Sequence, residues 1–106
     1  VSAQIPRGAM PDALFWDTSD PYYFVRLERR GDQDYVIFGG EDHKTGQKGD
    51  PRECFAALES RLHAWLPEAV VKHRWSGQVI EAIDGLPYIG LVAPGQFVAT
   101  GFSGNG

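Results

Sequence analysis

One amphipathic helix with a clear start and a clear end constrains the fold of this chain more than any other feature. Asp50 can cap the free amides of a first turn, Pro51 suits the first helical position, and Glu53 completes a capping box. Pro67 ends the segment because proline cannot continue a helix. We therefore predict a helix over residues 51–66. Its apolar residues recur at spacings of three and four and form the face that covers a sheet: Phe55, Leu58, Leu62, Trp65 and Leu66.

Two short β-prone runs precede this helix. Residues 22–28 and 35–38 are rich in aromatic and β-branched side chains, and they flank a turn cluster at 31–34. This pattern predicts an antiparallel hairpin. Residues 1–20 contain three prolines or glycines and a polar cluster, and we expect a loop or an edge segment around a short apolar patch at 13–16.

Three more runs follow the helix. Residues 70–75 alternate between two faces and predict a half-buried strand. Residues 88–92 and 96–100 flank Ala93–Pro94–Gly95, which indicates a second hairpin. The order β-β-α-β-β-β has no regular alternation of strands and helices. It predicts an α+β fold with a mostly antiparallel sheet and one packed helix.

Size and charge exclude several classes of protein. A chain of 106 residues is enough for one small domain, so we expect a single domain over residues 1–106. The net charge is -4 without a basic stripe, so we expect no nucleic-acid partner, and no apolar run is long enough for a membrane span. The one cysteine, Cys54, fits a reducing compartment, so we expect a cytoplasmic protein, with Cys54 as a small apolar residue of the helix.

Short catalytic and metal-binding motifs are absent from the sequence. The three histidines match no metal-ligand spacing, so we expect no metal site. Glu41 and Asp42 stand beside His43 after a predicted strand, where loops often carry sites, but we favour a solvated loop. The sequence assigns no catalytic residue.

The last 33 residues carry the most specific pattern. Trp75-Ser76-Gly77 is followed by a run from Asp84 to Gly90 that reads Asp-Gly-Leu-Pro-Tyr-Ile-Gly. A short strand then ends in Gly101-Phe102-Ser103-Gly104-Asn105-Gly106. In these three pieces the sequence resembles the glycine oxidase, sarcosine oxidase and D-amino-acid dehydrogenase group of FAD-dependent oxidoreductases. The resemblance extends to the first hairpin and to the helix, and it is weak over residues 1–20.

The resemblance implies a function and a set of site residues. It implies an enzyme that oxidises a C–N bond of a small amine or amino acid by hydride transfer to FAD. In the family, backbone amides of the glycine-rich loop face the flavin and stabilise the charge that it gains on reduction. The implied cofactor residues are Gly101, Phe102, Ser103, Gly104 and Asn105. The implied substrate pocket includes Trp75, Gly77, Pro87 and Tyr88.

The sequence departs from the family in two places. Amino-acid-oxidising members often carry an arginine after the Trp-x-Gly turn, where it grips the substrate carboxylate; here Val79 and Ile80 occupy those positions. The glycine-rich dinucleotide turn of the family's FAD-binding half is also absent. We therefore expect a fragment of the substrate-binding domain that is inactive alone and has the FAD-binding half of the same polypeptide as its partner.

The alternative is a self-contained, non-enzymatic α+β binding module. Its interface would be an aromatic groove made from Phe15, Trp16, Tyr22 and Tyr23. Against this alternative, we expect those four aromatics to lie in the core.

Overall fold

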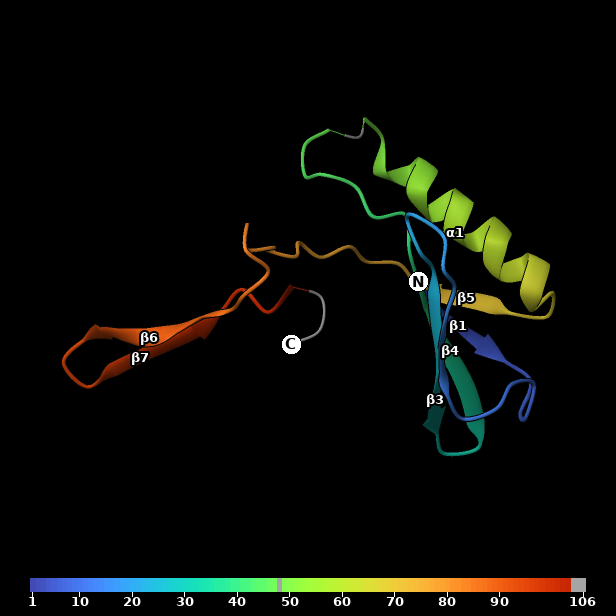
Figure 1. Ribbon diagram of the computed structural model, residues 1–106. Coiled ribbons are helices and arrows are strands. Elements are labelled where there is room, and N and C mark those ends of the chain that lie inside the picture. Colours follow the sequence, from blue (N-terminus) through green and yellow to red (C-terminus); the bar gives the residue numbers. More distant parts are fainter. Residues whose placement is uncertain (48, 104–106) are drawn as a thin grey trace. The chain divides into compact units, whose positions relative to one another are not determined.

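The computed structural model describes residues 1–47 and 49–103, which form two compact units, Val1–Trp75 and Ser76–Gly106. The first unit is a five-stranded antiparallel sheet with one helix, and the second is a two-stranded hairpin (Figure 1). The predicted α+β class with antiparallel strands and a single helix is confirmed. The expectation of one domain stays a prediction.

The strands of the first sheet follow the order β2-β3-β4-β1-β5. The predicted first hairpin is present: Val25 of β3 pairs with Phe38 of β4, and Arg30 pairs with Gln33 across the turn. The turn contains Gly31 at a φ of 59°, a conformation that glycine adopts without strain. The bounds of the strands are β1 (Ser2–Ile5), β2 (Leu14–Trp16), β3 (Phe24–Arg30), β4 (Gln33–Gly39) and β5 (Val70–His73).

The expectation of a loop or edge segment over residues 1–20 is wrong for β1. This strand lies between β4 and β5, and its residues Ala3 and Ile5 are buried. Strand β1 has only four residues and is followed by a proline, so its alternation of buried and exposed residues is too short to identify it from the sequence. Both strands that pair with β1 lie far along the chain. The apolar patch at 13–16 does form an edge strand, β2.

Helix α1 (Pro51–Trp65) begins where the sequence predicts and ends one residue before the predicted end, with Leu66 as its C-cap. Asp50 Oδ1 accepts a hydrogen bond from the Arg52 amide at 2.9 Å, so the cap is formed. Leu58 and Leu62 are buried, and the predicted face also contributes the partly buried Phe55 and Leu66. Trp65 departs from the prediction and is 50% exposed, although its ring meets that of Phe38 edge to face at a centroid distance of 6.1 Å.

The two faces of the sheet differ in chemistry. Val25, Val36 and Phe38 point to the face that α1 covers and are buried there with the helix leucines. Their neighbours along the strands, such as Tyr35 and Ile37, point to the opposite face and are only half-buried. Within the first unit, helix α1 covers only one of the two faces of the sheet.

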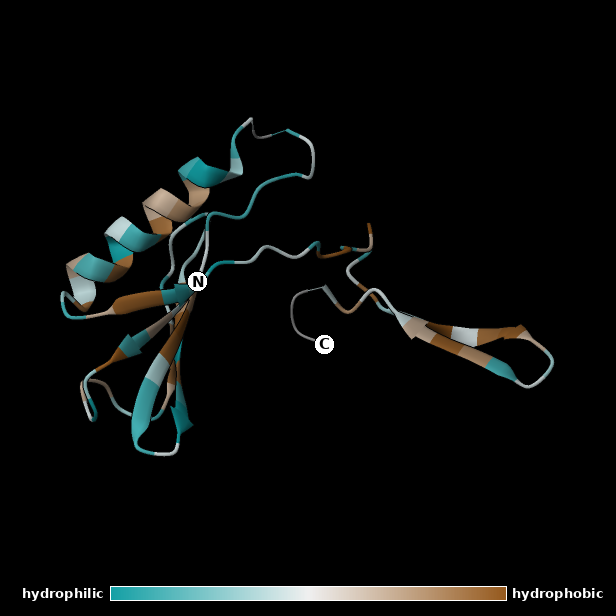
Figure 2. Cartoon of the chain, turned by 180° about the vertical axis from the view of Figure 1, so that it is seen from behind, coloured by the Kyte–Doolittle hydropathy of each residue, from teal (hydrophilic) through white to brown (hydrophobic). Residues whose placement is uncertain are grey.

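The second unit contains β6 (Tyr88–Ala93) and β7 (Gln96–Thr100), which are paired in the predicted hairpin. Gly95 in the turn has a φ of 72°. Ile89, Leu91 and Phe97 are strongly exposed, and the hairpin is largely apolar along both strands (Figure 2).

Candidate functional site

The end of β4 is a strained turn. Gly39 is followed by Gly40 at a φ of 152° and Glu41 at a φ of 60°. A left-handed conformation is unfavourable for glutamate, and such residues cluster at functional sites. A Cβ atom on Gly40 would lie 2.4 Å from Cδ1 of Tyr23, so the tyrosine ring packs directly on the glycine backbone.

A polar network extends from this turn through Tyr23. The Tyr23 hydroxyl donates to Oε1 of Glu41 at 2.5 Å, and the guanidinium carbon of Arg61 lies 4.1 Å from the centroid of the Tyr23 ring. Arg61 also pairs with Asp17 at 3.4 Å, and Asp17 Oδ1 accepts from the Tyr23 amide at 2.9 Å. We call Asp17, Tyr23, Glu41 and Arg61 the Tyr23 network. It joins two loops to helix α1.

The network shifts the pKa values of two of its members. The hydrogen bond to Glu41 is the largest effect on Tyr23 and raises the pKa of its phenol, with burial and the Glu41 charge acting in the same direction. The hydrogen bond from the Tyr23 amide is the largest effect on Asp17 and lowers the pKa of its carboxyl. Tyr23 therefore remains a neutral hydrogen-bond donor and Asp17 remains an anion at neutral pH.

The sequence did not single out this network. The sequence favours a solvated loop for Glu41, Asp42 and His43, and the structure agrees for Asp42 and His43, whose side chains are exposed. Glu41 is half-buried and bonded to Tyr23. The two consecutive glycines before Glu41 were the available signal, because they mark a place where side chains approach the backbone closely.

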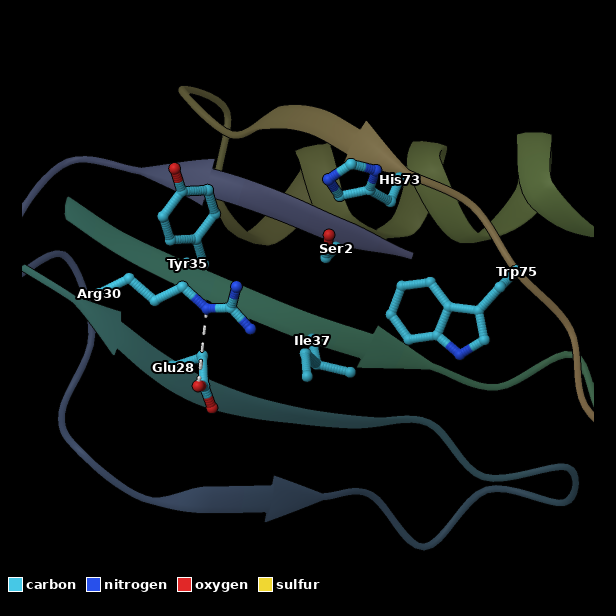
Figure 3. Close-up of a pocket in the computed structure, with 7 residues that line it drawn as sticks. All are labelled: Ser2, Glu28, Arg30, Tyr35, Ile37, His73 and Trp75. Carbon is cyan, nitrogen blue, oxygen red and sulfur yellow. Dashed lines mark ion pairs between the residues drawn. The ribbon is translucent and has the colours of Figure 1, made fainter.

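A trough lies on the sheet face opposite α1 (Figure 3). Its volume is about 370 Å³, within the usual range for small-molecule sites. Arg30 stands at one end, where its Nε lies 3.8 Å from Oε1 of Glu28, and Trp75 stands at the other (Figure 3). The lining residues are Ser2, Glu28, Arg30, Tyr35, Ile37, His73 and Trp75.

Of the predicted substrate-pocket residues, only Trp75 lines this trough. The other six lining residues were missed because the pairing of β1 with β4 and β5 brings them together, and that register is not visible in the sequence. Arg74, next to Trp75, forms an ion pair with Glu59 of α1 and does not line the trough.

The remaining predicted pocket residues lie in the second unit. Tyr88 opens β6 after Pro87, and its ring packs on Gly101, where a Cβ atom would lie 3.0 Å from Cδ2 of Tyr88. The structure thus brings Tyr88 to the start of the glycine-rich loop. Gly77 has open space where a side chain would be.

The glycine-rich loop is described as far as Ser103. Gly101 and Ser103 have φ values of 77° and 57°, and Phe102 between them is exposed. This backbone turns directly after β7, and the predicted contact of the loop with the flavin stays a prediction. Gly104 and Asn105 of the predicted cofactor site lie outside the described residues. No glycine-rich strand–turn–helix that could hold the FAD pyrophosphate is found in residues 1–47 and 49–103.

The described parts of the chain contain no group of three or more side chains that could hold a metal ion. No described helix is long and apolar enough to cross a membrane.

Comparison with known proteins assigns the chain to a family. The family described as FAD dependent oxidoreductase matches residues 2–106, so the chain belongs to this family, and the resemblance is confirmed. The protein YhfW of Bacillus subtilis (strain 168), which is named for a Rieske 2Fe-2S iron–sulfur centre, is 26% identical over 105 residues. The match covers 96% of this chain and 21% of YhfW, so the chain spans about one-fifth of that relative's length. No solved structure matches the chain at a significant level.

Proposed function

We propose that this chain is the substrate-side part of a longer FAD-dependent oxidoreductase that oxidises a C–N bond of a small amine or amino acid by hydride transfer to flavin. The family match over residues 2–106 carries this proposal. We expect the 106 residues alone to be inactive, because residues 1–47 and 49–103 contain no strand–turn–helix that could hold the FAD pyrophosphate. The partner is the FAD-binding half of the same polypeptide, and the buried thiol of Cys54 supports a cytoplasmic location.

The flavin supplies the electron acceptor, and the chain supplies backbone amides. The loop from Gly101 to Asn105 faces the flavin in this proposal, and its amides stabilise the negative charge of the reduced ring. The positive φ values of Gly101 and Ser103 support it, because they turn the backbone out of the strand directly after β7.

The Tyr23 network supplies the polar groups of the substrate side. A strained glutamate and a tyrosine of raised pKa together favour a functional site over a solvated loop. Glu41 and the Tyr23 hydroxyl would orient an amine by hydrogen bonds. Val79 and Ile80, both exposed and apolar, offer no cation for a substrate carboxylate, which favours an amine over an amino acid.

The reaction class is tested with the longer protein purified with its FAD. Small primary and secondary amines, amino acids and matched 2-hydroxy acids are mixed with it anaerobically, and the flavin absorbance is followed. The proposal expects an amine or amino acid to reduce the flavin, while the hydroxy acids leave it oxidised. Reduction by hydroxy acids alone would place the reaction at a C–O bond and refute the proposal.

The proposal that another part of the polypeptide binds the FAD pyrophosphate is tested with the 106-residue chain. Titration with FAD, followed by flavin fluorescence, should show no tight complex. A dissociation constant of about 1 μM or below, equivalent to about -8 kcal/mol, would contradict the assignment of the pyrophosphate site to another part of the polypeptide.

A second function, a non-enzymatic binding module, is favoured by one observation. Phe15, Trp16 and Tyr22 are exposed, so the expectation that they lie in the core is wrong for these three residues and holds only in part for the half-buried Tyr23. The coding sequence discriminates between the two functions. A reading frame that continues past Gly106 into an apolar helix supports the oxidoreductase, and a stop codon there supports the module.

A further inference from the structure

A β-bulge determines which side chains of β5 reach the trough on the sheet face opposite α1. Ala3 of β1 pairs with Val71 of β5. The next pair joins Ser2 to His73, so Lys72 is an extra residue on β5. In a regular strand the side chain opposite Ser2 would be that of Lys72. The bulge therefore gives the trough an imidazole ring where a regular strand would place an ammonium group.

Trp75 presents an aromatic surface at one end of the trough. It follows His73 by two residues and lines the trough with it (Figure 3). Its side chain is 51% exposed, and no other ring of the described residues stacks on it. Tyr35 and Ile37 of the central strand β4 are half-buried in the floor of the trough. An open indole ring beside this floor suits a flat aromatic ligand.

The charge of this sheet face favours an anion, although the whole chain has a net charge of -4. Three charged residues of β3 alternate with its buried residues and therefore share the face opposite α1: Arg26, Glu28 and Arg30. The residues of β1 and β4 that point to this face are uncharged. Strand β3 thus gives the face a surplus of one positive charge.

Arg30 has the geometry to bind a carboxylate. Its ion pair with Glu28 is long, with 3.8 Å between Nε and Oε1, and its side chain is 76% exposed. Exposed pairs hold a side chain only weakly, so the guanidinium is accessible to a ligand. The backbone amides of β1 and β4 are used in pairing, because each of these strands lies between two others, and the floor offers no cradle of amides for a phosphate. A planar carboxylate is the anion that a single guanidinium matches.

We propose that the trough binds an elongated aromatic carboxylate, with the carboxylate on Arg30 and the ring system against Trp75. Two residues along a strand span about 7 Å, and three neighbouring strands span about 10 Å. A ligand of two linked rings matches this span, and the volume of about 370 Å³ has room for it. The inference goes beyond the proposed function, because the whole trough lies in the first unit and its ligand needs no FAD.

Binding is measured by titrating the 106-residue chain with biphenyl-4-carboxylate at neutral pH. NMR follows the indole N–H signals of Trp16, Trp65 and Trp75, and the Trp75 signal is identified by its loss in Trp75→Leu. We expect a saturable shift of the Trp75 signal with a dissociation constant of about 1 mM or below. The neutral biphenyl-4-carboxamide should bind about tenfold or more weakly, because it lacks the charge that Arg30 pairs with. Equal affinities for the two ligands, or no saturable shift at Trp75, would overturn the inference.

Two arginine variants separate binding in the trough from general attraction of an anion. Arg30→Gln should weaken binding of the carboxylate by about tenfold or more, to the level of the carboxamide. Arg29→Gln is the matched control and should leave binding unchanged, because Arg29 pairs with Asp12 at 3.4 Å and does not line the trough. An equal loss in both variants would contradict the proposal.

The same titration of the longer protein with bound FAD shows whether the trough stays open there. We expect the same dependence on Arg30. Loss of binding would mean that another part of the polypeptide fills the trough, and it would overturn the proposal. The result is independent of the test of amine oxidation, because a protein that fails to oxidise amines can still bind the carboxylate, and one that oxidises them can fail to bind it.

Discussion

Leu62 is completely buried between α1 and the sheet, where it joins Val36 and Phe38 in the core. Replacing it with alanine should lower the free energy of unfolding by about 2–5 kcal/mol, because a cavity remains where the side chain was. Urea unfolding of the 106-residue chain measures the change. Ser60→Ala, on the exposed face of the same helix, is the matched control and should stay within about 0.5 kcal/mol. A loss of similar size in both variants would show that the Leu62 face is not the core.

Tyr23 should titrate at a higher pH than an ordinary tyrosine. Its pKa is raised above the ordinary value of 10.0, first by the hydrogen bond to Glu41. The fold therefore favours the neutral phenol, and its contribution to stability is complete below about pH 10 and lost as the pH rises through the folded pKa. We expect the phenolate absorbance of Tyr23, identified by its loss in Tyr23→Phe, to appear above the ordinary range. Glu41→Gln removes the charge and should move the pKa down. An unchanged titration in Glu41→Gln would contradict the network.

Residues differ in how far the sequence predicts their roles. Asp50 was predictable as a cap because its bonding partner, the Arg52 amide, is two residues away. The contact between Tyr23 and Glu41 was not, because it depends on the pairing of β3 with β4 and on a left-handed φ at Glu41. Hydrogen bonds between residues close in the sequence could thus be predicted, and contacts that depend on strand register could not.

At the scale of elements, the two hairpins were predictable because each has a short turn with a glycine of positive φ. Strand β1 was not, because its position in the middle of the sheet depends on partners that are at least 29 residues away along the chain. The trough on the sheet face opposite α1 could not be predicted for the same reason, because β1 and β5 supply Ser2 and His73 to its lining.

The hairpin β6–β7 should open more easily than the hairpin β3–β4. A two-stranded hairpin with exposed apolar side chains is marginal in water, whereas β3–β4 has a covered core face. Amide exchange in the 106-residue chain should therefore be faster in β6–β7 than in β3–β4, where opening approaches global unfolding. Mass spectrometry of peptides from residues 88–100 and 24–39 compares the two hairpins. Equal protection of both would mean that the second unit is stable without further covering.

At the scale of the molecule, the sequence predicted the family and the fold class, and it did not predict the division at Ser76. The family motifs around Trp75, Asp84 and Gly101 are short stretches of consecutive residues, so the sequence alone is enough to recognise them. The division into two units depends on which elements contact one another. A list of the predicted helix and hairpins does not say which of them are in contact. The trough and the Tyr23 network belong to the first unit, and the glycine-rich loop belongs to the second.

If the loop beginning at Gly101 faces the flavin through its backbone, two variants of the longer protein should differ in the rate at which their flavin is reduced. Gly104→Val adds a branched side chain to a loop whose glycines permit close approach of the backbone, at a position outside the described residues. With FAD fully bound, anaerobic flavin reduction by substrate should slow by about 10²-fold or more, the scale on which one well-placed donor acts. Ser103→Ala, which keeps the backbone, should leave the rate nearly unchanged. Reduction of Gly104→Val at the wild-type rate would show that the loop is a structural turn and that the flavin contacts lie elsewhere.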